Sequence, residues 1–364
     1  MARILLAPDS FKGSASSSEV ANAVAKGWTA ARTSDQITTI AFGDGGEGTL
    51  ECIAGAVADA QKIEVVAQGA DGRDRATYWL LVNGDTAVIE MAAICGITTQ
   101  EKLDALGAHS FGLGQVIAAA LKYPGVKEIL VAVGGSASTD AGIGALMALG
   151  CKAVGADGDL ALGGGALRNL TRIDLPAGYV APERGVKILV DVQSPMTGAD
   201  GAAFVYGPQK GASAGDVEVL DAGLKNFLVV VGVQDRAGYG AAGGVSGGLA
   251  TVLGAQIVSG VETLAQLSGL LEKLNEVDCV VTGEGAFDSQ SFRGKVVGYV
   301  LEQAKVRGVA SMVVCGVNKN GANNEVISLV ELAPSVGDAI KNPARWLEVA
   351  GQQLAERFGA IVAS

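Results

Sequence analysis

The sequence predicts an α/β protein of two domains, in which a mixed α/β domain is inserted into a three-layer α/β/α domain with a parallel sheet. Strands and helices alternate at both ends of the chain, an order typical of parallel sheets covered by helices on both faces. The middle of the chain carries a hairpin pattern instead. The length of 364 residues also favours two domains over one.

The N-terminal part of the first domain is predicted to run strand, loop, helix. Residues 3–7 form a short apolar run that predicts a buried strand. Ser16 stands three residues before Glu19, which is the spacing of a capping box at a helix start. A second strand at 37–42 and a helix at 50–60 follow.

The C-terminal part repeats this pattern. It predicts a strand at 279–282, a polar loop, a helix from Lys295 to Ala304 and a strand at 311–315. We therefore expect both chain ends, residues 1–65 and 262–364, to form one discontinuous, Rossmann-like domain.

The inserted domain, residues 66–261, is predicted to be mixed. Asn83-Gly84 between two apolar runs is a strong signal for a hairpin turn. Strands are expected at 63–66, 77–82, 86–91, 128–133 and 187–192.

Composition excludes several classes of protein. With 49% hydrophobic residues and 53 glycines, the chain can build a large core, so disorder and collagen are excluded. The net charge of −11, without a basic run, argues against nucleic acid as a partner. Residues 237–261 are uncharged but glycine-rich, so we expect a buried loop and helix there and no membrane span. No signal peptide is recognisable, because Pro8 and Asp9 interrupt the first apolar run, and a cytoplasmic location is expected.

The five cysteines are scattered and form no Cys-x-x-Cys pair, as expected for core residues under reducing conditions. His109 is the single histidine, so every catalytic triad or histidine metal site would need it. A hydrogen-bonded histidine at a helix start is the favoured interpretation of His109. The acid–base group is therefore expected to be a carboxylate.

Four loops combine glycine, hydroxyl groups and an acid or lysine, and each follows a predicted strand. They are residues 8–14, 43–49, 134–142 and 282–295. In parallel sheets such loops meet at the carboxyl edge, where backbone N–H groups bind phosphate and carboxylates bind a divalent cation. This set favours phosphoryl transfer, which depends on positioning and charge neutralisation.

Structural alternatives stay open for these residues. Asp140 or Ser16 could serve only as an N-cap, and Asp191 at a strand tip could be a turn former. Lys210 could bind an anion or lie solvated in a loop, and the glycines of 239–248 could admit a nucleotide or another helix. The sequence has no Walker P-loop, no protein-kinase motif set and no complete dinucleotide fingerprint.

Six segments in register carry a family resemblance: 8–14, 44–49, 134–137, 207–212, 240–244 and 282–295. With them the chain resembles the bacterial type I glycerate kinases, which phosphorylate D-glycerate to 2-phosphoglycerate. The resemblance implies a cytoplasmic kinase that needs ATP and magnesium and has its active site in a cleft between two α/β domains. Small-molecule substrates, no membrane partner and a monomer or small homo-oligomer are expected.

The resemblance also implies site residues. Asp191 is the candidate catalytic residue that orients or deprotonates the substrate hydroxyl, and Lys12 is a second candidate catalytic residue that meets phosphate or substrate. Candidate substrate and phosphate ligands are Asp9, Ser10, Asp44, Gly45, Gly46, Glu47, Gly134, Gly135, Ser136, Ser138, Asp140, Gly243, Gly244, Glu284, Asp288, Gln290, Arg293 and Lys295. The substrate carboxylate is expected near Lys12 or Arg293. Candidate metal ligands are Asp44, Glu47, Glu284 and Asp288.

The chain departs from the family pattern at three places. Ser138-Thr139-Asp140 replaces Thr-Asn-Asp, Gln193 replaces an aspartate, and Ala286 replaces an arginine. These changes bear on substrate preference and on a metal role near Gln193. A non-catalytic anion- or nucleotide-binding module and an NAD-dependent hydroxy-acid dehydrogenase are the alternative functions, the second weakened by the missing fingerprint.

Overall fold

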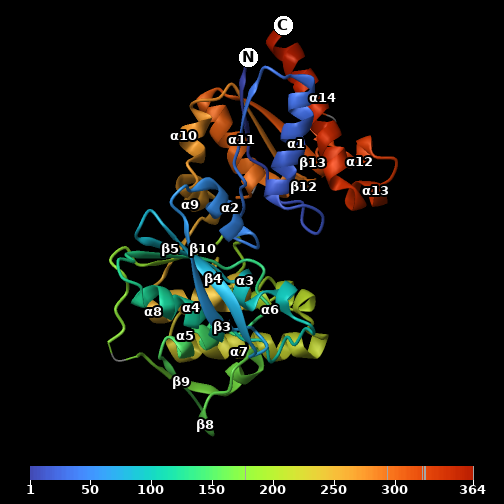
Figure 1. Ribbon diagram of the computed structural model, residues 1–364. Coiled ribbons are helices and arrows are strands. Elements are labelled where there is room, and N and C mark those ends of the chain that lie inside the picture. Colours follow the sequence, from blue (N-terminus) through green and yellow to red (C-terminus); the bar gives the residue numbers. More distant parts are fainter. Residues whose placement is uncertain (177, 293, 322, 324, 364) are drawn as a thin grey trace. The chain divides into compact units, whose positions relative to one another are not determined.

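The computed structural model describes residues 1–176, 178–292, 294–321, 323 and 325–363, and the chain divides into two compact units (Figure 1). Unit 1 comprises Met1–Asp44, Glu51–Ala58 and Val261–Ser364. Unit 2 comprises Gly45–Leu50 and Asp59–Gly260. Unit 1 thus takes residues from both ends of the chain.

Unit 1 is built on a five-stranded parallel sheet in the order β14-β13-β12-β1-β2. Its strands are β1 (Arg3–Leu6), β2 (Gln36–Thr39), β12 (Cys279–Phe287), β13 (Ala310–Asn318) and β14 (Val326–Ser328). The predicted parallel α/β fold is therefore confirmed. β12 continues into the segment predicted as a polar loop, because residues as far as Phe287 stay in parallel register with β13.

Helices cover both faces of this sheet. Ile4 and Leu6 of β1 pack with Trp28 and Phe358, which belong to α1 (Ser17–Ala31) and α14 (Pro343–Ala363). On the other face, Val313 of β13 packs with α11 (Val296–Arg307). The remaining helices are α2 (Thr49–Ala56), α9 (Gly260–Leu267), α10 (Leu270–Leu274), η5 (Ser289–Phe292), α12 (Leu329–Leu332) and α13 (Val336–Lys341). Three layers result.

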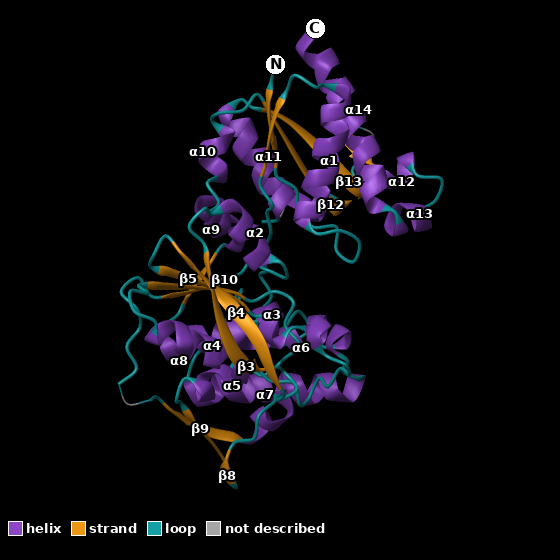
Figure 2. Cartoon of the chain, viewed as in Figure 1, coloured by secondary structure: helices purple, strands orange, loops and turns teal. Residues whose placement is uncertain are grey.

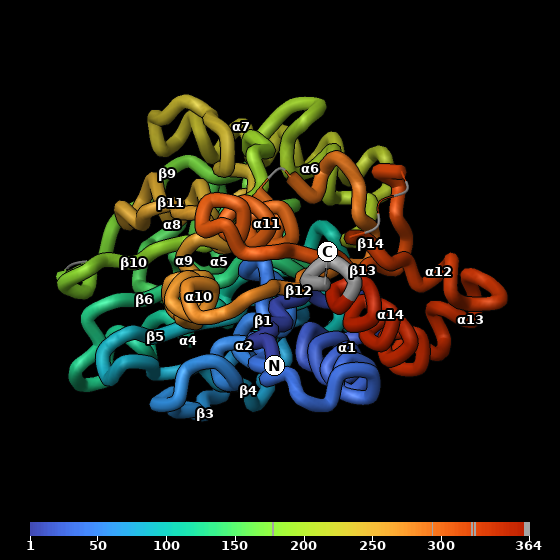
Figure 3. Tube along the Cα trace, turned by 90° about the horizontal axis from the view of Figure 1, so that it is seen from above, coloured from blue at the N-terminus to red at the C-terminus, as the bar shows by residue number. Residues whose placement is uncertain are grey.

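The helices α1 and α14 lie side by side in Figures 1 and 3. A Cβ on Gly27 would stand 1.8 Å from the carbonyl oxygen of Glu348, so only glycine permits this approach. The predicted capping box at the start of α1 is confirmed: the Ser16 hydroxyl accepts from the Glu19 N–H at 3.3 Å, and the Glu19 carboxylate accepts from the Ser16 N–H at 2.8 Å.

Unit 2 is built on a six-stranded mixed sheet in the order β11-β10-β6-β5-β4-β3 (Figure 2). β3, β4 and β5 are antiparallel neighbours, whereas β5, β6, β10 and β11 are parallel. The strands are β3 (Gln61–Gln68), β4 (Asp74–Val82), β5 (Thr86–Glu90), β6 (Glu128–Ala132), β10 (Val186–Leu189) and β11 (Gln256–Val258). The predicted hairpin turn is confirmed by positive φ at Asn83 (52°) and Gly84 (73°).

Helices and a small second sheet complete unit 2. The helices are α3 (Ala92–Cys95), η1 (Ile97–Thr99), α4 (Phe111–Lys122), α5 (Ile143–Ala148), η2 (Gly164–Asn169), α6 (Ala202–Tyr206), η3 (Pro208–Lys210), α7 (Ala214–Val231), η4 (Ala241–Gly244) and α8 (Val245–Leu253). The small antiparallel sheet consists of β7 (Lys152–Gly155), β8 (Gly158–Asp159) and β9 (Leu170–Asp174). The buried loop and helix predicted within 237–261 are present as η4 and α8, and the short strand β11 was missed.

In the part of the chain that the structure describes, no helix combines the length and the apolar character needed to cross a bilayer.

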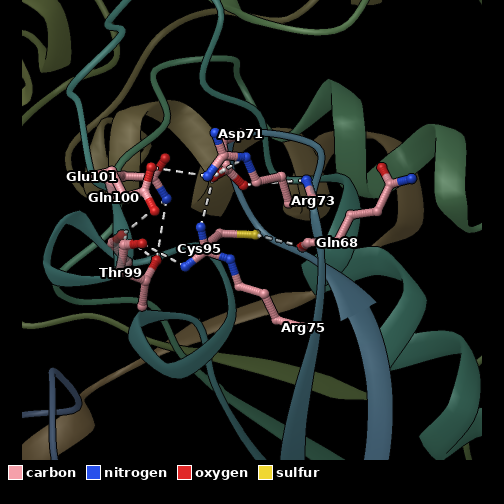
Figure 4. A network of polar contacts seen from close by, with 9 residues as sticks. Gln68, Asp71, Arg73, Arg75, Cys95, Thr99, Gln100 and Glu101 are labelled. Atoms are coloured by element: carbon pink, nitrogen blue, oxygen red, sulfur yellow. Dashed lines mark hydrogen bonds and ion pairs between the residues drawn. The ribbon is translucent and has the colours of Figure 1, made fainter.

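A polar network ties the β3–β4 turn to the segment that follows α3 (Figure 4). The Arg75 guanidinium pairs with Asp71 at 2.7 Å and also donates to the carbonyl oxygen of Thr99. Arg73 pairs with Glu101 at 3.0 Å. These contacts hold residues 95–101, which lie beside the glycine loop 134–137, because the Ile97 N–H donates to the Gly135 oxygen and the Ala137 N–H to the Cys95 oxygen.

Candidate functional site

Charged residues gather at the carboxyl edge of the sheet in unit 1. Asp9 follows β1, Asp44 follows β2, and Glu284 lies within β12. Because these strands are parallel neighbours, their ends meet at one edge. The Asp9 N–H donates to the Gly283 oxygen at 2.8 Å, which fixes the start of the Asp9 loop against β12.

The electrostatics of this edge are strongly coupled. Burial raises the pKa of Asp9 to about 7, and the nearby Asp44 carboxylate adds to the rise. Asp44 raises the pKa of Lys12, whose ammonium lies 3.4 Å from the Asp44 carboxylate. Burial raises the pKa of Glu284, and its Oε1 is buried without a hydrogen-bond partner among the described residues. Three carboxylates and one exposed lysine thus share one field that favours an added cation.

A cavity of about 420 Å³ opens at this edge. Part of its lining is polar or charged: Asp9, Ser10, Lys12, Asp44, Glu284 and Lys295. Another part is apolar: Val317, Leu329, Val330, Val336, Ala339 and Ile340. All of these residues belong to unit 1. A cavity lined by both charged and apolar residues suits a ligand that carries a phosphate chain on a flat heterocycle.

The predicted metal ligands do not form a ready-made cage. Among the described residues, no group of three or more histidine, cysteine or acidic side chains is placed to hold a metal ion. Glu47 accepts from the Thr98 hydroxyl at 3.3 Å within unit 2, and Asp288 accepts from the Gln290 N–H at 2.8 Å. Glu47 belongs to unit 2 and the other three candidates belong to unit 1, and the assignment of the metal to Asp44, Glu47, Glu284 or Asp288 stays a prediction. Asp44 and Glu284 keep the oxygen donors that magnesium prefers, and magnesium in kinases needs only one or two carboxylates beside the phosphates.

At the carboxyl edge of the unit 2 sheet, Asp191 lies two residues after β10. The predicted strand 187–192 ends earlier than expected, at Leu189, so Asp191 belongs to the following loop. Its Oδ1 accepts from the Ser259 hydroxyl and from the Gly260 N–H, each at 3.0 Å. These two donors fix the orientation of the carboxylate.

Two predicted glycine loops meet at this edge. The Gly134 N–H donates to the Gly45 oxygen at 3.1 Å, and a Cβ on Gly134 would lie 2.6 Å from the Cα of Gly46. A Cβ on Gly45, where φ is +80°, would lie 3.3 Å from the Cβ of Leu189 at the end of β10. The glycines are thus required by close backbone approach, and they bring the loops after β2, β6 and β10 together.

Sequence reasoning missed Glu90. This buried residue ends β5, and its carboxylate accepts from the N–H groups of Gly48 and Leu50 at 3.1 and 2.9 Å. It therefore fixes the end of the 43–49 loop. The available signal was an acid at the end of an otherwise apolar strand, the same signal that pointed to Asp191.

Other predicted ligands turn inward. Asp140 is fully buried, and its carboxylate accepts from the Ser110 N–H and hydroxyl and from the N–H groups of Gly142 and Gly144, at 2.8–3.3 Å. This favours the structural alternative, in which Asp140 holds two helix starts together. Ser138 is also fully buried, so neither side chain reaches a ligand at the surface.

Gly243 and Gly244 are likewise buried. A Cβ on Gly243 would lie 2.2 Å from the Ser138 oxygen, and one on Gly244 would lie 3.0 Å from the Cα of Ala141. The close approach is between two backbone segments, which favours a packing role for these glycines, and phosphate binding by them stays a prediction.

For His109 the structure supports the interpretation that the sequence favoured, whereas for Lys210 it excludes one of the two alternatives. The Nδ1 of His109 accepts weakly from the Phe111 N–H at 3.4 Å, at the start of α4, which is the favoured structural interpretation. Lys210 is 3% exposed, so the solvated-loop interpretation is wrong. Its ammonium donates to the Ser136 hydroxyl and to the Ser138 carbonyl oxygen. Burial lowers the pKa of Lys210 to about 7.

The last predicted ligands lie around the 282–295 segment. Lys295 lines the cavity of unit 1 and precedes α11. Gln290 is exposed in η5. Arg293 lies outside the described residues.

Comparison with known proteins decides the family. The model of the glycerate kinase family matches residues 4–359. The chain belongs to the glycerate kinase family.

Named relatives agree with this family membership. The chain is 38% identical to the glycerate 2-kinase of Escherichia coli K12, over 83% of this chain and 82% of the relative. It is 34% identical to the glycerate kinase of Halalkalibacterium halodurans, over 98% of each chain. A crystal structure of a candidate glycerate kinase 2 from Salmonella typhimurium LT2 superposes with a TM-score of 0.82 at 32% identity and covers 100% of both chains. Family membership confirms the resemblance that the six segments carried and places the chain among kinases.

Proposed function

We propose that this protein transfers the terminal phosphoryl group of ATP to the 2-hydroxyl of D-glycerate, giving 2-phosphoglycerate and ADP. Family membership and the glycerate 2-kinase of Escherichia coli among the relatives support the reaction and the position of transfer. The observation that carries the proposal is the cavity of unit 1, because charged and apolar residues line the same space.

We assign the nucleotide to this cavity. Its apolar lining, which includes Leu329, Val336 and Ile340, suits the adenine ring, and its charged lining offers the ammonium groups of Lys12 and Lys295 to the phosphates. The cavity volume of about 420 Å³ falls within the usual range of small-molecule sites. Lys12 is exposed, and among the described residues its ammonium makes one ion pair, to Asp44 at 3.4 Å, so it can move onto a phosphate oxygen.

Asp44 and Glu284 would hold the magnesium ion. When bound there, the ion supplies positive charge that neutralises the phosphate oxygens during transfer. The Oε1 of Glu284 is buried without a hydrogen-bond partner among the described residues, and burial raises the pKa of this residue, so a cation would stabilise its charged form. Asp9 contributes to the same field.

Asp191 would accept the proton of the reacting hydroxyl. The hydroxyl oxygen forms the new bond to the terminal phosphorus, the bond from that phosphorus to the bridging oxygen breaks, and ADP leaves with the electron pair. The donors from Ser259 and Gly260 hold the Asp191 carboxylate in one orientation, as a positioned base requires. Since the transition state of phosphoryl transfer is loose, orientation of the hydroxyl contributes as well as proton removal.

The test is an ADP-release assay with D-glycerate, combined with phosphorus NMR of the product. We expect ADP release that depends on D-glycerate and on magnesium, and a product resonance coupled to the proton on C2. L-Glycerate is the matched control for the acceptor. Binding of ATP without glycerate-dependent ADP release would refute the kinase proposal in favour of a non-catalytic nucleotide-binding module. A product coupled to the C3 protons would refute the assigned hydroxyl alone.

A further inference from the structure

Lys210 is a buried cation that the proposed reaction does not use. It ends η3, and its side chain is almost completely enclosed within unit 2. No ion pair joins it to an acid among the described residues, and the nearest attractive charge is Asp140, whose carboxylate is occupied by four donors. Burial of an unpaired ammonium is expensive, so its place in the fold calls for a role.

The ammonium of Lys210 fixes the glycine loop after β6. It donates to the Ser136 hydroxyl oxygen at 3.0 Å and to the carbonyl oxygen of Ser138. The same loop is also held by the segment after α3, through the hydrogen bonds of Ile97 and Ala137. Two sets of contacts therefore fix the loop, in which Gly134 and Gly135 are the more accessible residues and Ser136 is 5% exposed.

The contact with Lys210 also decides what Ser136 can do. In its protonated form the Lys210 ammonium has only donors, so the Ser136 oxygen accepts, and the Ser136 proton is left to be donated elsewhere. No acceptor for that proton is found among the described residues. Two further hydroxyls of this loop, Ser138 Oγ and Thr139 Oγ1, are buried and have no hydrogen-bond partner among the residues that the structure describes. The loop thus keeps a polar arrangement that its own contacts do not satisfy.

We propose that Lys210 is a positioning residue that turns the Ser136 hydroxyl into a donor for the carboxylate of the substrate, bound at Gly134–Ser136. This inference rests on the proposed function, because it names the part of the acceptor that the loop holds. It differs from the sequence expectation, which placed the substrate carboxylate near Lys12 or Arg293.

The place of the loop in the sheet supports this assignment. β6 and β10 are parallel neighbours, with Val131 opposite Ile188 and Ala132 opposite Leu189. The loop after β6 and Asp191 after β10 therefore lie at the same edge of the unit 2 sheet. A short hydroxy acid could place its carboxylate on the loop and its hydroxyl at Asp191, because these groups are separated by one carbon atom in a 2-hydroxy acid.

The experiment compares Lys210→Met, Ser136→Ala and the double variant with the full-length chain. We expect each single change to raise the KM for D-glycerate about tenfold or more, while the KM for ATP changes less than twofold. Because Lys210 acts through Ser136, the double variant should be no worse than the more damaged single variant. Lys305→Met, at an exposed site, and Ser268→Ala, a buried serine of unit 1, are the matched controls and should leave both constants unchanged.

Several outcomes overturn the inference. Lys210 would have a purely structural role if the effects of the two single changes multiplied in the double variant. The same would follow from an equal rise in both KM values or from normal kinetics in Ser136→Ala. If Lys210→Met does not fold, Ser136→Ala and Ser136→Cys carry the test, with thermal melting as the check that they are folded.

Calorimetric binding of D-glycerate separates this inference from the proposed function. If the unaltered chain binds D-glycerate without phosphorylating it, and the variants bind it at least tenfold more weakly, the kinase proposal fails and the inference stands. If the chain is an active glycerate kinase and the variants are normal, only the inference fails. An unaltered chain that neither binds nor phosphorylates D-glycerate refutes both.

Discussion

The carboxyl edges of the two sheets use similar residues in opposite ways. In unit 1, Asp9, Asp44 and Glu284 repel one another around a cavity, and Asp9 is held with a raised pKa. In unit 2, the carboxylates of Glu90 and Asp140 are buried but collect backbone N–H groups. An acid beside glycines is thus functional or structural according to whether local donors converge on it.

Substitutions of an acid by its amide test this comparison most strongly. For Asp191→Asn we expect kcat to fall about 100-fold or more, because the base is lost. The amide oxygen can still accept from Ser259 and Gly260, so the melting temperature should change little. Steady-state kinetics and thermal melting of the purified variant provide the measurement. A normal kcat would remove Asp191 from the mechanism.

Asp140→Asn is the matched control from the structural class. An amide nitrogen cannot accept, so at least one of the four donors around Asp140 loses its partner. Its unfolding free energy should fall by about 1–3 kcal/mol. Loss of activity without loss of stability in this variant would contradict the structural role.

A smaller effect is expected from Lys12→Met, which tests whether unit 1 binds ATP and unit 2 binds D-glycerate. The Lys12 side chain is 78% exposed, so its removal should leave stability unchanged. We expect the KM for ATP to rise about tenfold, near 1.4 kcal/mol, with little change in the KM for D-glycerate. Lys26→Met, at another exposed lysine, is the control. A rise confined to the glycerate KM would return the substrate carboxylate to Lys12.

The last prediction concerns the pH dependence of stability. Burial lowers the pKa of Lys210 to about 7 from 10.5. Between these values the folded chain binds fewer protons than the unfolded chain, so this group makes stability rise with pH above 7, by at most about 1.4 kcal/mol per pH unit. The unfolding free energy of the unaltered chain should therefore rise from pH 7 to pH 9 relative to that of Lys210→Met, which lacks this titrating group. Denaturant unfolding at several pH values measures it, and a constant difference would contradict a buried, titrating ammonium.

Local patterns predicted much of the fold because their causes are local. The capping box at Ser16 and the Asn83-Gly84 turn depend on neighbouring residues alone, and both are present. The extension of β12 to Phe287 was not predictable, because the glycine-rich segment becomes a strand only when β13 lies beside it.

The sequence predicted the type of the candidate site, acids and a lysine beside glycine loops, but not every residue in it. The order of the motifs predicted Asp9, Lys12, Asp44 and Glu284 as site residues, and in the structure they lie at one edge of the unit 1 sheet. Glu90 was missed, since its importance depends on the N–H groups of Gly48 and Leu50, about forty positions earlier in the chain.

The sequence by itself determined the alternation of strands and helices, the glycine loops and the family, because periodicity, turn chemistry and motif order are written along the chain. Tertiary structure decided which polar groups face a cavity and which are enclosed. Lys210 shows the reason: a lysine in a glycine-rich loop carries the same local signal in either setting. Only the packing of η3 against the Ser136 loop removes it from water and gives it hydrogen-bond partners.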